Sequence, residues 1–461
     1  MKTRIFLSVL LSLALLQGCS KSGGGSSTSN GSVRLVNAYA SLANTSTSLD
    51  MTVSSSVLAT TSFASGITTG NASTAVAIAP GIYTFSLAAS GNPVSQQSLL
   101  ISSAMPYALV AHPQGGQVQL TALTENELAP AAGDVKIRIS NLAVQDTGGV
   151  DVYVVATSGA TSTSVPAGVA PIASNLGVAS GYFEIPQGKY QVWVTGVGKP
   201  ADVRLYLPAV AITNPNVTTL VLTSTAGGVL VDGWLVTQGD STVTPLSNTS
   251  ARLRVVANVT GSASVVATAT DTTTGTVAPS PLDGLSTMTS PEVGTYALVP
   301  PAGALSLSVA VDGTSYPVDL TQQLAACPSC LGPGTDSTLL VAGQAGSPPT
   351  FHLINDNNAL PPGGMAKLRL VNGINVTGAA VNLSLTADVN LVAQNVAFGT
   401  ASTPATLAPA TDSLQVTPLL TSTSSPPWSP SSSLTLQSQG VYSVFAVGDN
   451  TTPQAIVRAD R

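Results

Sequence analysis

Four short stretches of this chain share one pattern, an arginine between two aliphatic residues, and they decide the fold: Val33-Arg34-Leu35, Ile137-Arg138-Ile139, Leu253-Arg254-Val255 and Leu368-Arg369-Leu370. Successive arginines are 104, 116 and 115 residues apart. A repeat of that length has the size of a small domain, whereas solenoid repeats span about 20 to 50 residues. The chain is therefore predicted to consist of four tandem domains.

The composition predicts that these domains are built from β-strands. Only 8% of the 461 residues are charged and 44% are hydrophobic, and the chain has 42 Gly and 31 Pro. Val and Thr fit a pleated sheet, while frequent Gly and Pro leave little room for long amphipathic helices. The net charge of −6, with only 15 scattered Lys and Arg, argues against nucleic acid as a partner, because neutralising phosphates needs clustered basic residues.

Three further markers recur in each repeat and predict short strands. A second stretch with period-two alternation follows the arginine strand: Leu49 to Val53, Val150 to Val154, a weaker Ser264 to Val266, and Val381 to Leu385. A proline turn comes next, at Pro80, Pro186, Pro300 and Pro409, and a closing strand ends each repeat: Tyr107 to Ala111, Thr218 to Leu222, Ser337 to Ala342 and Val441 to Val447. About seven strands per 100 residues predict four tandem immunoglobulin-like β-sandwiches at 33–131, 132–248, 249–363 and 364–461, although several small barrels fit the same pattern.

The order of these markers resembles the domain-of-unknown-function 4397 family of bacterial envelope proteins. Its members begin with an aliphatic-Arg-aliphatic strand ending in Asn or His, followed by a Val-Asp-Val-Tyr-Val strand and a Pro-Gly-x-Tyr turn. The second repeat matches best, through Ile137 to Asn141, Val150 to Val154 and Pro186 to Tyr190; the first is close through Asp50 and Tyr83, and the fourth has Asn382 in place of the acidic residue. The resemblance implies a fold and an envelope location, and no activity or functional residues.

The N-terminus has the features of a lipoprotein signal peptide. Lys2 and Arg4 precede an apolar run from Ile5 to Leu16, which is too short to span a bilayer but matches a secretory signal. The run ends in Leu16-Gln17-Gly18-Cys19, which resembles the bacterial lipobox, where a signal peptidase cuts before an acylated cysteine. Residues 1–18 are therefore predicted to be removed, and Cys19 is predicted to be lipidated.

The predicted partner of Cys19 is a lipid bilayer. Several buried acyl chains, at about 0.8 kcal/mol per CH₂, would hold the chain stably without a transmembrane helix. Ser20 follows the cysteine in place of aspartate, which resembles the outer-membrane sorting pattern of diderm bacteria. The Gly/Ser-rich part of residues 19–32 would form a tether that reaches roughly 20 Å. The expected location is the outer membrane, at the cell surface or on the periplasmic face.

Cys327 and Cys330 are the two cysteines that remain, and an exported, oxidising compartment predicts a disulfide between them. Cys-Pro-Ser-Cys resembles the redox pair of thioredoxin-like oxidoreductases, in which the first cysteine starts a helix that lowers its thiol pKa. Here Leu331-Gly332-Pro333-Gly334 follows at once and breaks any helix. A stapled surface loop is therefore favoured over redox catalysis.

The repeated arginines are matched by acidic residues on the next predicted strand. Arg34 lies 16 residues before Asp50, and Arg138 lies 13 residues before Asp151, which suits a strand, a turn and a strand. Each couple is predicted to form a structural cross-strand ion pair worth about 0.2 to 1 kcal/mol. The alternative is a repeated site for an anionic ligand, which Asn382 disfavours because an amide still accepts a hydrogen bond from arginine.

Residues for catalysis or cofactor binding are scarce. The two imidazoles, His112 and His352, belong to non-adjacent repeats, and the sequence has no phosphate loop, nucleophile elbow or paired metal-binding histidines. The run Asn355 to Asn358 between the third and fourth repeats holds one carboxylate, and calcium sites usually have more carboxylate ligands than this. We therefore expect no enzyme activity, no cofactor and no metal site.

Trp428 is the candidate residue for ligand contact. It lies in the proline-rich loop Ser424 to Pro430, which has little to bury it, and packing back on its own domain is the competing interpretation. Together with the anchor and the repeats, it predicts a structural or adhesive display rod for protein or polysaccharide contact. The alternative is a periplasm-facing, non-catalytic binding or assembly subunit of an envelope complex.

Overall fold

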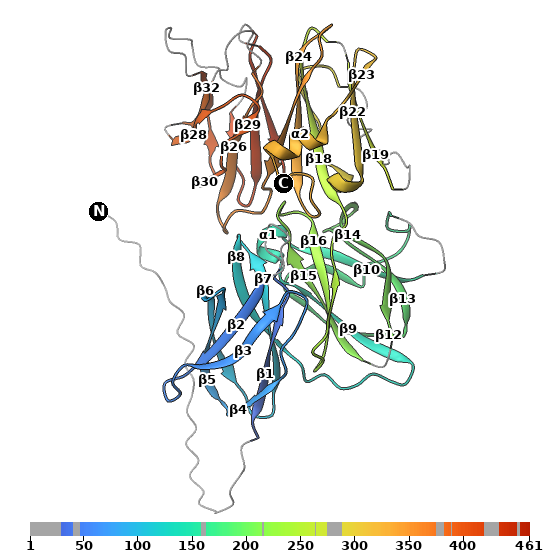
Figure 1. Cartoon of the computed structure of the whole chain (residues 1–461), viewed down its shortest axis with the longest axis vertical. Coiled ribbons are helices and arrows are strands. Elements are labelled where there is room, and N and C mark those ends of the chain that lie inside the picture. The colour runs from blue at the N-terminus through green and yellow to red at the C-terminus, as the bar shows by residue number, and fades with distance from the viewer. Residues whose placement is uncertain are drawn as a thin grey trace, which may run out of the picture.

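The computed structural model describes residues 29–39, 47–157, 163–213, 216–262, 264–273, 288–374, 382–388, 390–418, 433–449 and 452–461. These residues form four β-sandwiches, called modules 1 to 4 in chain order (Figure 1). The predicted all-β fold of tandem sandwiches is confirmed. The residue boundaries proposed between the domains stay a prediction.

Module 1 consists of two four-stranded sheets packed face to face. One has the order β4-β1-β7-β8 and the other the order β3-β2-β5-β6. Leu35, Leu49, Phe85 and Leu109 lie in the core between the sheets, because alternate residues of each strand face inward. The strands are β1 (Gly31–Asn37), β2 (Ser48–Ser54), β3 (Thr61–Thr68), β4 (Val76–Ile78), β5 (Gly81–Ala89), β6 (Asn92–Ile101), β7 (Pro106–Gln114) and β8 (Gln117–Thr124).

Module 2 pairs a four-stranded sheet, β11-β10-β13-β14, with a five-stranded sheet, β12-β9-β15-β16-β17. Ile137, Val152, Val192 and Leu220 belong to its core. The elements are β9 (Asp134–Asn141), α1 (Val144–Thr147), β10 (Val150–Ala156), β11 (Ala173–Leu176), β12 (Ala179–Pro186), β13 (Gly188–Gly196), β14 (Lys199–Ile212), β15 (Val217–Ser224), β16 (Val231–Thr237) and β17 (Val243–Leu246).

Module 3 pairs the sheet β20-β18-β24-β25, in which β21 also pairs with β18, with the sheet β19-β22-β23. The side chain of Asp319 caps α2 by accepting from the Thr321 N–H at 3.0 Å. The helix ends at the Cys327–Cys330 disulfide, so the predicted disulfide is confirmed. The loop is not confined to the surface as expected, because Cys330 is buried in the core of module 3. The elements are β18 (Ala251–Thr260), β19 (Val265–Asp271), β20 (Glu292–Val293), β21 (Ala297–Val299), the 3₁₀ turn η2 (Ala302–Ala304), β22 (Leu305–Val311), β23 (Thr314–Pro317), α2 (Leu320–Ala326), β24 (Asp336–Gln344) and β25 (Thr350–Asp356).

Module 4 pairs the sheet β29-β26-β34-β35, in which β30 also pairs with β26, with the sheet β28-β27-β32, and adds a ribbon of β31 and β33. Leu370, Leu385, Val416 and Val444 belong to its core. The strands are β26 (Ala366–Asn372), β27 (Leu383–Ala387), β28 (Asn390–Val396), β29 (Thr400–Ala401), β30 (Ala405–Leu407), β31 (Thr411–Asp412), β32 (Leu414–Pro418), β33 (Leu434–Thr435), β34 (Val441–Val447) and β35 (Gln454–Ala459).

All four arginine strands have the same place in their modules. Each runs parallel to the closing strand of its own repeat, β1 with β7, β9 with β15, β18 with β24 and β26 with β34. Side chains alternate across a strand, so the aliphatic neighbours Val33 and Leu35 enter the core of module 1 while Arg34 lies on the opposite face of the sheet. That opposite face is buried as well.

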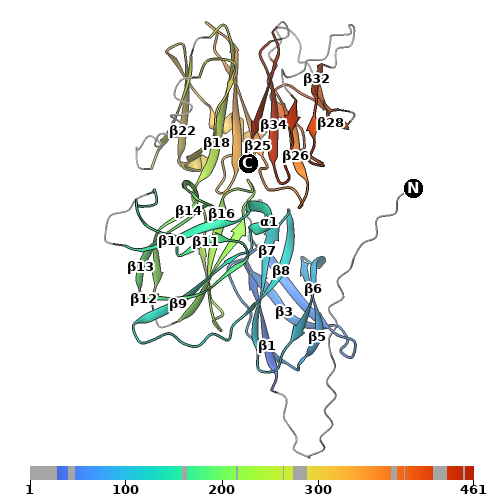
Figure 2. The same cartoon turned by 180° about the vertical axis from the view of Figure 1, so that it is seen from behind.

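The modules lie side by side in two pairs, modules 1 and 2 below and modules 3 and 4 above (Figures 1 and 2). An apolar cluster joins the first pair and includes Val36 and Val110 of module 1 with Val221 and Trp234 of module 2. A second cluster joins the other pair: Val256, Val293, Leu340, Ala342, Ile354, Val371, Phe445 and Val447. The display rod expected from the tandem repeats is therefore two modules wide, because the outer faces of the arginine sheets are apolar enough to pack on each other.

Candidate functional site

The repeated arginines do not pair with the acidic residues predicted for them. Strands β1 and β2 belong to opposite sheets of module 1, and β9 and β10 to opposite sheets of module 2, so their side chains do not face each other across one sheet. Asp50 and Asp151 instead accept hydrogen bonds from backbone N–H groups of their own modules. The predicted cross-strand pairs Arg34–Asp50 and Arg138–Asp151 are wrong.

Arg34 crosses to module 2. Its guanidinium forms a buried ion pair with Glu125 of its own module, with Nε 2.9 Å from Oε2. It also donates to the backbone carbonyls of Thr237, at 2.8 Å, and Asp240 in module 2. Because both charges are out of water, removing either one would leave the other buried without a partner.

Arg138 returns this contact from module 2 to module 1. Its Nη2 donates to the backbone carbonyl of Thr124 at 3.2 Å and to Thr219 Oγ1 at 3.1 Å. The guanidinium carbon lies 4.9 Å from the centre of the Tyr182 ring. The arginines of modules 1 and 2 therefore reach across the same interface in opposite directions.

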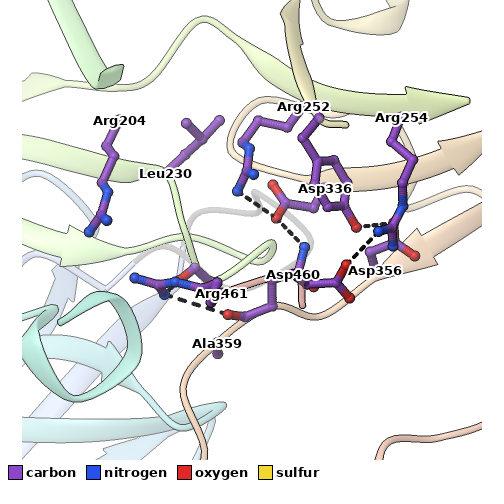
Figure 3. Close-up of polar contacts among 12 residues, drawn as sticks. Arg204, Leu230, Arg252, Arg254, Asp336, Asp356, Ala359, Asp460 and Arg461 are labelled. Carbon is purple, nitrogen blue, oxygen red and sulfur yellow. Dashed lines mark hydrogen bonds and ion pairs between the residues drawn. The ribbon is translucent and has the colours of Figure 1, made fainter. Parts of the chain in front are cut away.

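Arg254 and Arg369 do the same between modules 3 and 4, where they share two aspartates. Arg369 Nη1 lies 2.7 Å from Asp356 Oδ1, across the interface, and Arg254 forms an ion pair with Asp460 of module 4. Arg254 also lies 3.6 Å from Asp356 of its own module. All four side chains are almost completely buried, and Figure 3 shows Arg254 between the two aspartates.

Neutral side chains complete this charge network. Thr338 Oγ1 and the Tyr296 hydroxyl donate to Asp356 at 2.5 and 2.6 Å. Burial alone would raise the pKa of Asp356, but Arg369 and Arg254, together with these two hydrogen bonds, hold that pKa below its ordinary value. Asp356 is therefore ionised at neutral pH and ties both arginines to module 3.

A second polar cluster joins the upper pair of modules to the lower pair (Figure 3). The Arg461 guanidinium donates to the backbone carbonyls of Asp146, at 2.9 Å, and Gly228, at 3.0 Å, both in module 2. Burial, with Arg204 and Arg252 nearby, lowers the pKa of Arg461 to about 9. Arg461 thus holds module 4 on module 2 through neutral acceptors.

Arg252 anchors the module 3 side of this junction. Its Nη1 lies 3.1 Å from Asp336 Oδ2, which also accepts from Asn358 Nδ2 at 2.7 Å. The guanidinium carbon lies 4.5 Å from the centre of the Tyr296 ring. Burial raises the pKa of Asp336 to about 6, although Arg252 and Asn358 act in the opposite direction.

A cleft adjoins this junction, between β14 of module 2 and β21 of module 3. Two cavities of about 570 and 490 Å³ form it, and they share Ala201, Val203 and Leu298. We call it the 2–3 cleft. Its polar lining comes from Thr163, Ser164, Lys199, Asp202, Arg204, Tyr206, Asn248, Thr249, Ser250, Arg252, Asp271 and Tyr296.

Two aromatic residues, Tyr206 and Tyr296, line the 2–3 cleft, and Tyr206 is the one that stacks on a further ring. Its ring stacks on the fully buried Trp193, with ring centres 5.5 Å apart and planes at 28°. Trp193 lies directly opposite Tyr206 in the register of β13 and β14. Gln191 Nε2 donates to the Tyr206 hydroxyl at 3.3 Å. Cross-strand pairing therefore fixes where this ring meets the cleft.

Both histidines take part in packing, His112 within module 1 and His352 between modules 3 and 4. His112 is buried in module 1, where Nε2 lies 2.9 Å from Thr121 Oγ1, and burial lowers its pKa to about 4. His352 in β25 packs edge-on against Phe398, with ring centres 4.9 Å apart. Among the described residues, no group of three or more His, Cys, Asp or Glu is placed to hold a metal ion.

Two of the predicted site residues, Cys19 and Trp428, lie outside the described residues. The run Asn355 to Asn358 has structural roles, because Asp356 binds the arginines and Asn358 binds Asp336. Sequence reasoning missed Glu125, Asp356 and Asp460 as arginine partners. The sequence signal for them is a carboxylate at the end of the last strand of a repeat, and not one on the second strand.

The comparisons with known families support the resemblance drawn from the repeats. Residues 31–153 match the family described as "Domain of unknown function (DUF4397)". The matched segment covers module 1 and continues through β9 and β10 of module 2. The resemblance to this family is therefore confirmed for this part of the chain. No curated protein matches the sequence.

Several solved structures resemble the chain at low identity. The Bacillus anthracis TIE protein is 9% identical, over 70% of this chain and 51% of its own, with a TM-score of 0.14. CBMbc, of family CBM26, from Eubacterium rectale Amy13K in complex with maltoheptaose is 14% identical, over 47% of this chain and 96% of its own, with a TM-score of 0.16. The pneumococcal glycogen-degrading virulence factor SpuA is 9% identical, over 88% of this chain and 38% of its own, with a TM-score of 0.17. The chain spans about half the length of the TIE protein, and TM-scores this low carry no functional argument.

Proposed function

We propose that this chain is a membrane-anchored lipoprotein of the cell envelope that serves as a non-catalytic platform for protein or carbohydrate contact. The observation that carries the proposal is the pairing of modules through buried apolar clusters and buried arginine contacts. Paired modules hold their exposed surfaces at fixed positions, so a partner that touches two modules binds without first ordering a hinge.

The lipidated Cys19 is the proposed anchor. Among the described residues, no helix is both long and apolar enough to cross a bilayer. Replacing Cys19 with alanine is expected to move the protein from the membrane fraction to the soluble fraction, and mass spectrometry of the wild-type N-terminus should show the added acyl mass. An unmodified N-terminus on membrane-bound wild-type protein would contradict the anchor.

Exposure to protease separates the two envelope roles. If the chain displays its surfaces outward, protease added to intact cells should cleave it in exposed segments such as the edge of module 1 at Val57, which is 95% exposed. Complete protection in intact cells, followed by cleavage after the outer membrane is opened, would favour the periplasm-facing assembly subunit instead.

A binding role is favoured over catalysis because His112 serves the packing of module 1 and His352 serves the contact between modules 3 and 4. The His112→Ala and His352→Ala variants are therefore expected to lower the stability of the protein and to leave any turnover unchanged. A measured turnover that either variant abolished, with the fold intact by circular dichroism, would overturn the non-catalytic assignment.

A further inference from the structure

We propose that the 2–3 cleft is a binding site for a neutral glycan, with Tyr206 as the platform on which one pyranose ring stacks. The proposal rests on the binding role proposed above and assigns it to one place in the fold. The two cavities, of about 570 and 490 Å³, are in the size range of pockets that hold small ligands. Each module supplies one wall.

The Tyr206 ring is held rigid before any ligand arrives. The Trp193 ring stacks on one face of it, and the Gln191 amide donates a hydrogen bond to its hydroxyl. A ring that is already ordered loses little freedom on binding, so stacking against the apolar face of a sugar keeps most of its free energy. A backed aromatic ring beside hydroxyl and amide groups is the arrangement that a pyranose, with one apolar face and a polar rim, can use.

Both arginines that line the cleft pair with carboxylates of the protein, and the other charged residues of the lining, Lys199 and Asp271, have opposite charges. Arg204 Nη2 lies 3.0 Å from Asp202 Oδ2, and Arg252 Nη1 lies 3.1 Å from Asp336 Oδ2. A charged ligand would compete with these ion pairs and leave one member of a pair without its partner, which is costly where the carboxylate is buried. The cleft therefore favours a ligand without charge.

The edge of β14 argues against an added peptide strand. Among the described strands, β14 pairs with β13 alone, so its other edge faces outward. Pro200 and Pro208 interrupt this edge, and the register against β13 shifts three times. Prolines and bulges prevent an incoming strand from forming a continuous ladder. A ligand of this cleft is thus recognised by side chains and not by strand addition.

The linker between the two modules supplies polar groups at the rim. Asn248 Nδ2 donates to the backbone carbonyls of Arg204, at 2.7 Å, and Val231, which fixes the linker against module 2. The neighbouring Thr249 is exposed and Ser250 partly exposed, and both line the cleft. Their hydroxyl groups can donate to and accept from sugar hydroxyls.

The test uses full-length protein in detergent and an array of immobilised neutral oligosaccharides, with charged polyuronic and sulfated glycans on the same array. Wild-type protein is expected to bind a subset of the neutral glycans. The variant Tyr206→Ala should weaken that binding at least about tenfold, because it removes the stacking platform. The matched control is Tyr182→Ala, a partly buried tyrosine of the same module that does not line the cleft.

A second variant keeps the test decisive if Tyr206→Ala unfolds module 2. Ala201 is exposed and lines both cavities, so Ala201→Trp fills the cleft without removing any contact. Its control is Ala209→Trp, an exposed alanine of the same strand outside the cleft. The proposal predicts that Ala201→Trp abolishes glycan binding and that Ala209→Trp leaves it within about twofold.

The outcomes separate this inference from the platform role. Glycan binding that survives both cleft variants would overturn the 2–3 cleft as the site, while the platform role would stand. A blank array, or binding to charged glycans alone, would overturn the neutral-glycan assignment. Failure of the platform role would show up separately, as membrane-bound protein with an unmodified Cys19 or as a turnover lost with a histidine.

Discussion

The two module pairs use the same faces of the same strands, yet different chemistry holds them together. Modules 1 and 2 meet through Trp234 and small aliphatic residues. Their buried ion pair, Arg34–Glu125, lies within module 1, and the Lys136–Glu127 pair that crosses between them is partly exposed. Modules 3 and 4 instead exchange ion pairs, because Asp356 and Asp460 bind the arginines of both modules. One repeated strand therefore supports an interface fixed mainly by apolar packing and another fixed by crossed charges.

This difference predicts unequal tolerance to substitution. Removing one member of a buried ion pair leaves the other uncompensated, at a cost of about 3 to 5 kcal/mol. Loss of an apolar contact or of a hydrogen bond to a backbone carbonyl costs less. The upper pair should therefore be the more sensitive of the two to single changes.

The largest effect is expected for Asp356→Ala. It removes the shared acceptor of Arg254, Arg369 and Tyr296, so the free energy of unfolding of modules 3 and 4 should fall by about 3 to 5 kcal/mol. Urea denaturation followed by hydrogen exchange, resolved by module, measures this. Asp50→Ala is the control, since that carboxylate accepts a backbone hydrogen bond at the exposed surface of module 1. Equal losses in the two variants would refute the role of the network.

Lowering the pH should change the stability of the lower and upper module pairs in opposite directions. His112 has its pKa lowered from 6.5 to about 4, because burial disfavours the charged ring, so the unfolded chain takes up a proton before the folded chain does. The stability that this group contributes is present above pH 6.5 and is lost between pH 6.5 and 4, by about 3 kcal/mol in module 1. His112→Gln should remove most of that slope in denaturation experiments at pH 7 and pH 4.5.

Asp336 gives the opposite sign in module 3. Its raised pKa of about 6 means that the folded chain takes up a proton first, so this group favours folding more as the pH falls from 6 toward 4. Asp336→Asn should reduce that gain in stability.

The His112 prediction would be contradicted if module 1 of the wild-type protein kept its full stability at pH 4.5.

Arg34→Met tests the lower interface. It keeps most of the side-chain volume but removes the donor to Glu125, Thr237 and Asp240 and leaves the Glu125 carboxylate without its partner. A loss of about 3 kcal/mol is therefore expected. The paired control Arg138→Met should cost about 1 kcal/mol, because within the described part of the chain Arg138 pairs with hydroxyl and carbonyl groups and with no carboxylate. A larger loss for Arg138→Met would show that the lower pair depends on its reciprocal contact and not on Glu125.

The smallest effect is expected from the disulfide. Joint replacement of Cys327 and Cys330 with alanine opens a very short loop, so module 3 should lose at most about 2 kcal/mol. The contacts of Asp356 with module 4 should stay unchanged in hydrogen exchange. Ser329→Ala, within the same loop, is the control and should leave both quantities as they are.

Much of the fold could be read from period-two alternation and turn residues, including the arginine strands and the closing strands with which they pair. The location of the arginine contacts could not. A strand buried on both faces reads as a continuous apolar run, as in Tyr107 to Ala111, and that run carried the signal for a second covered face. The sequence alone does not say what covers this second face, because the same apolar residues would pack against a neighbouring module or against a loop of the same module.

The parallel pairing of β1 with β7 has a mechanical consequence. Residues 32–37 of β1 lie in register with residues 106–111 of β7, and the chain enters β1 at its first residue, Gly31. Tension applied through the preceding segment pulls along β1, so the backbone hydrogen bonds of this pair are loaded together in shear and do not open one at a time. Module 1 is thereby built to resist pulling from its N-terminal side.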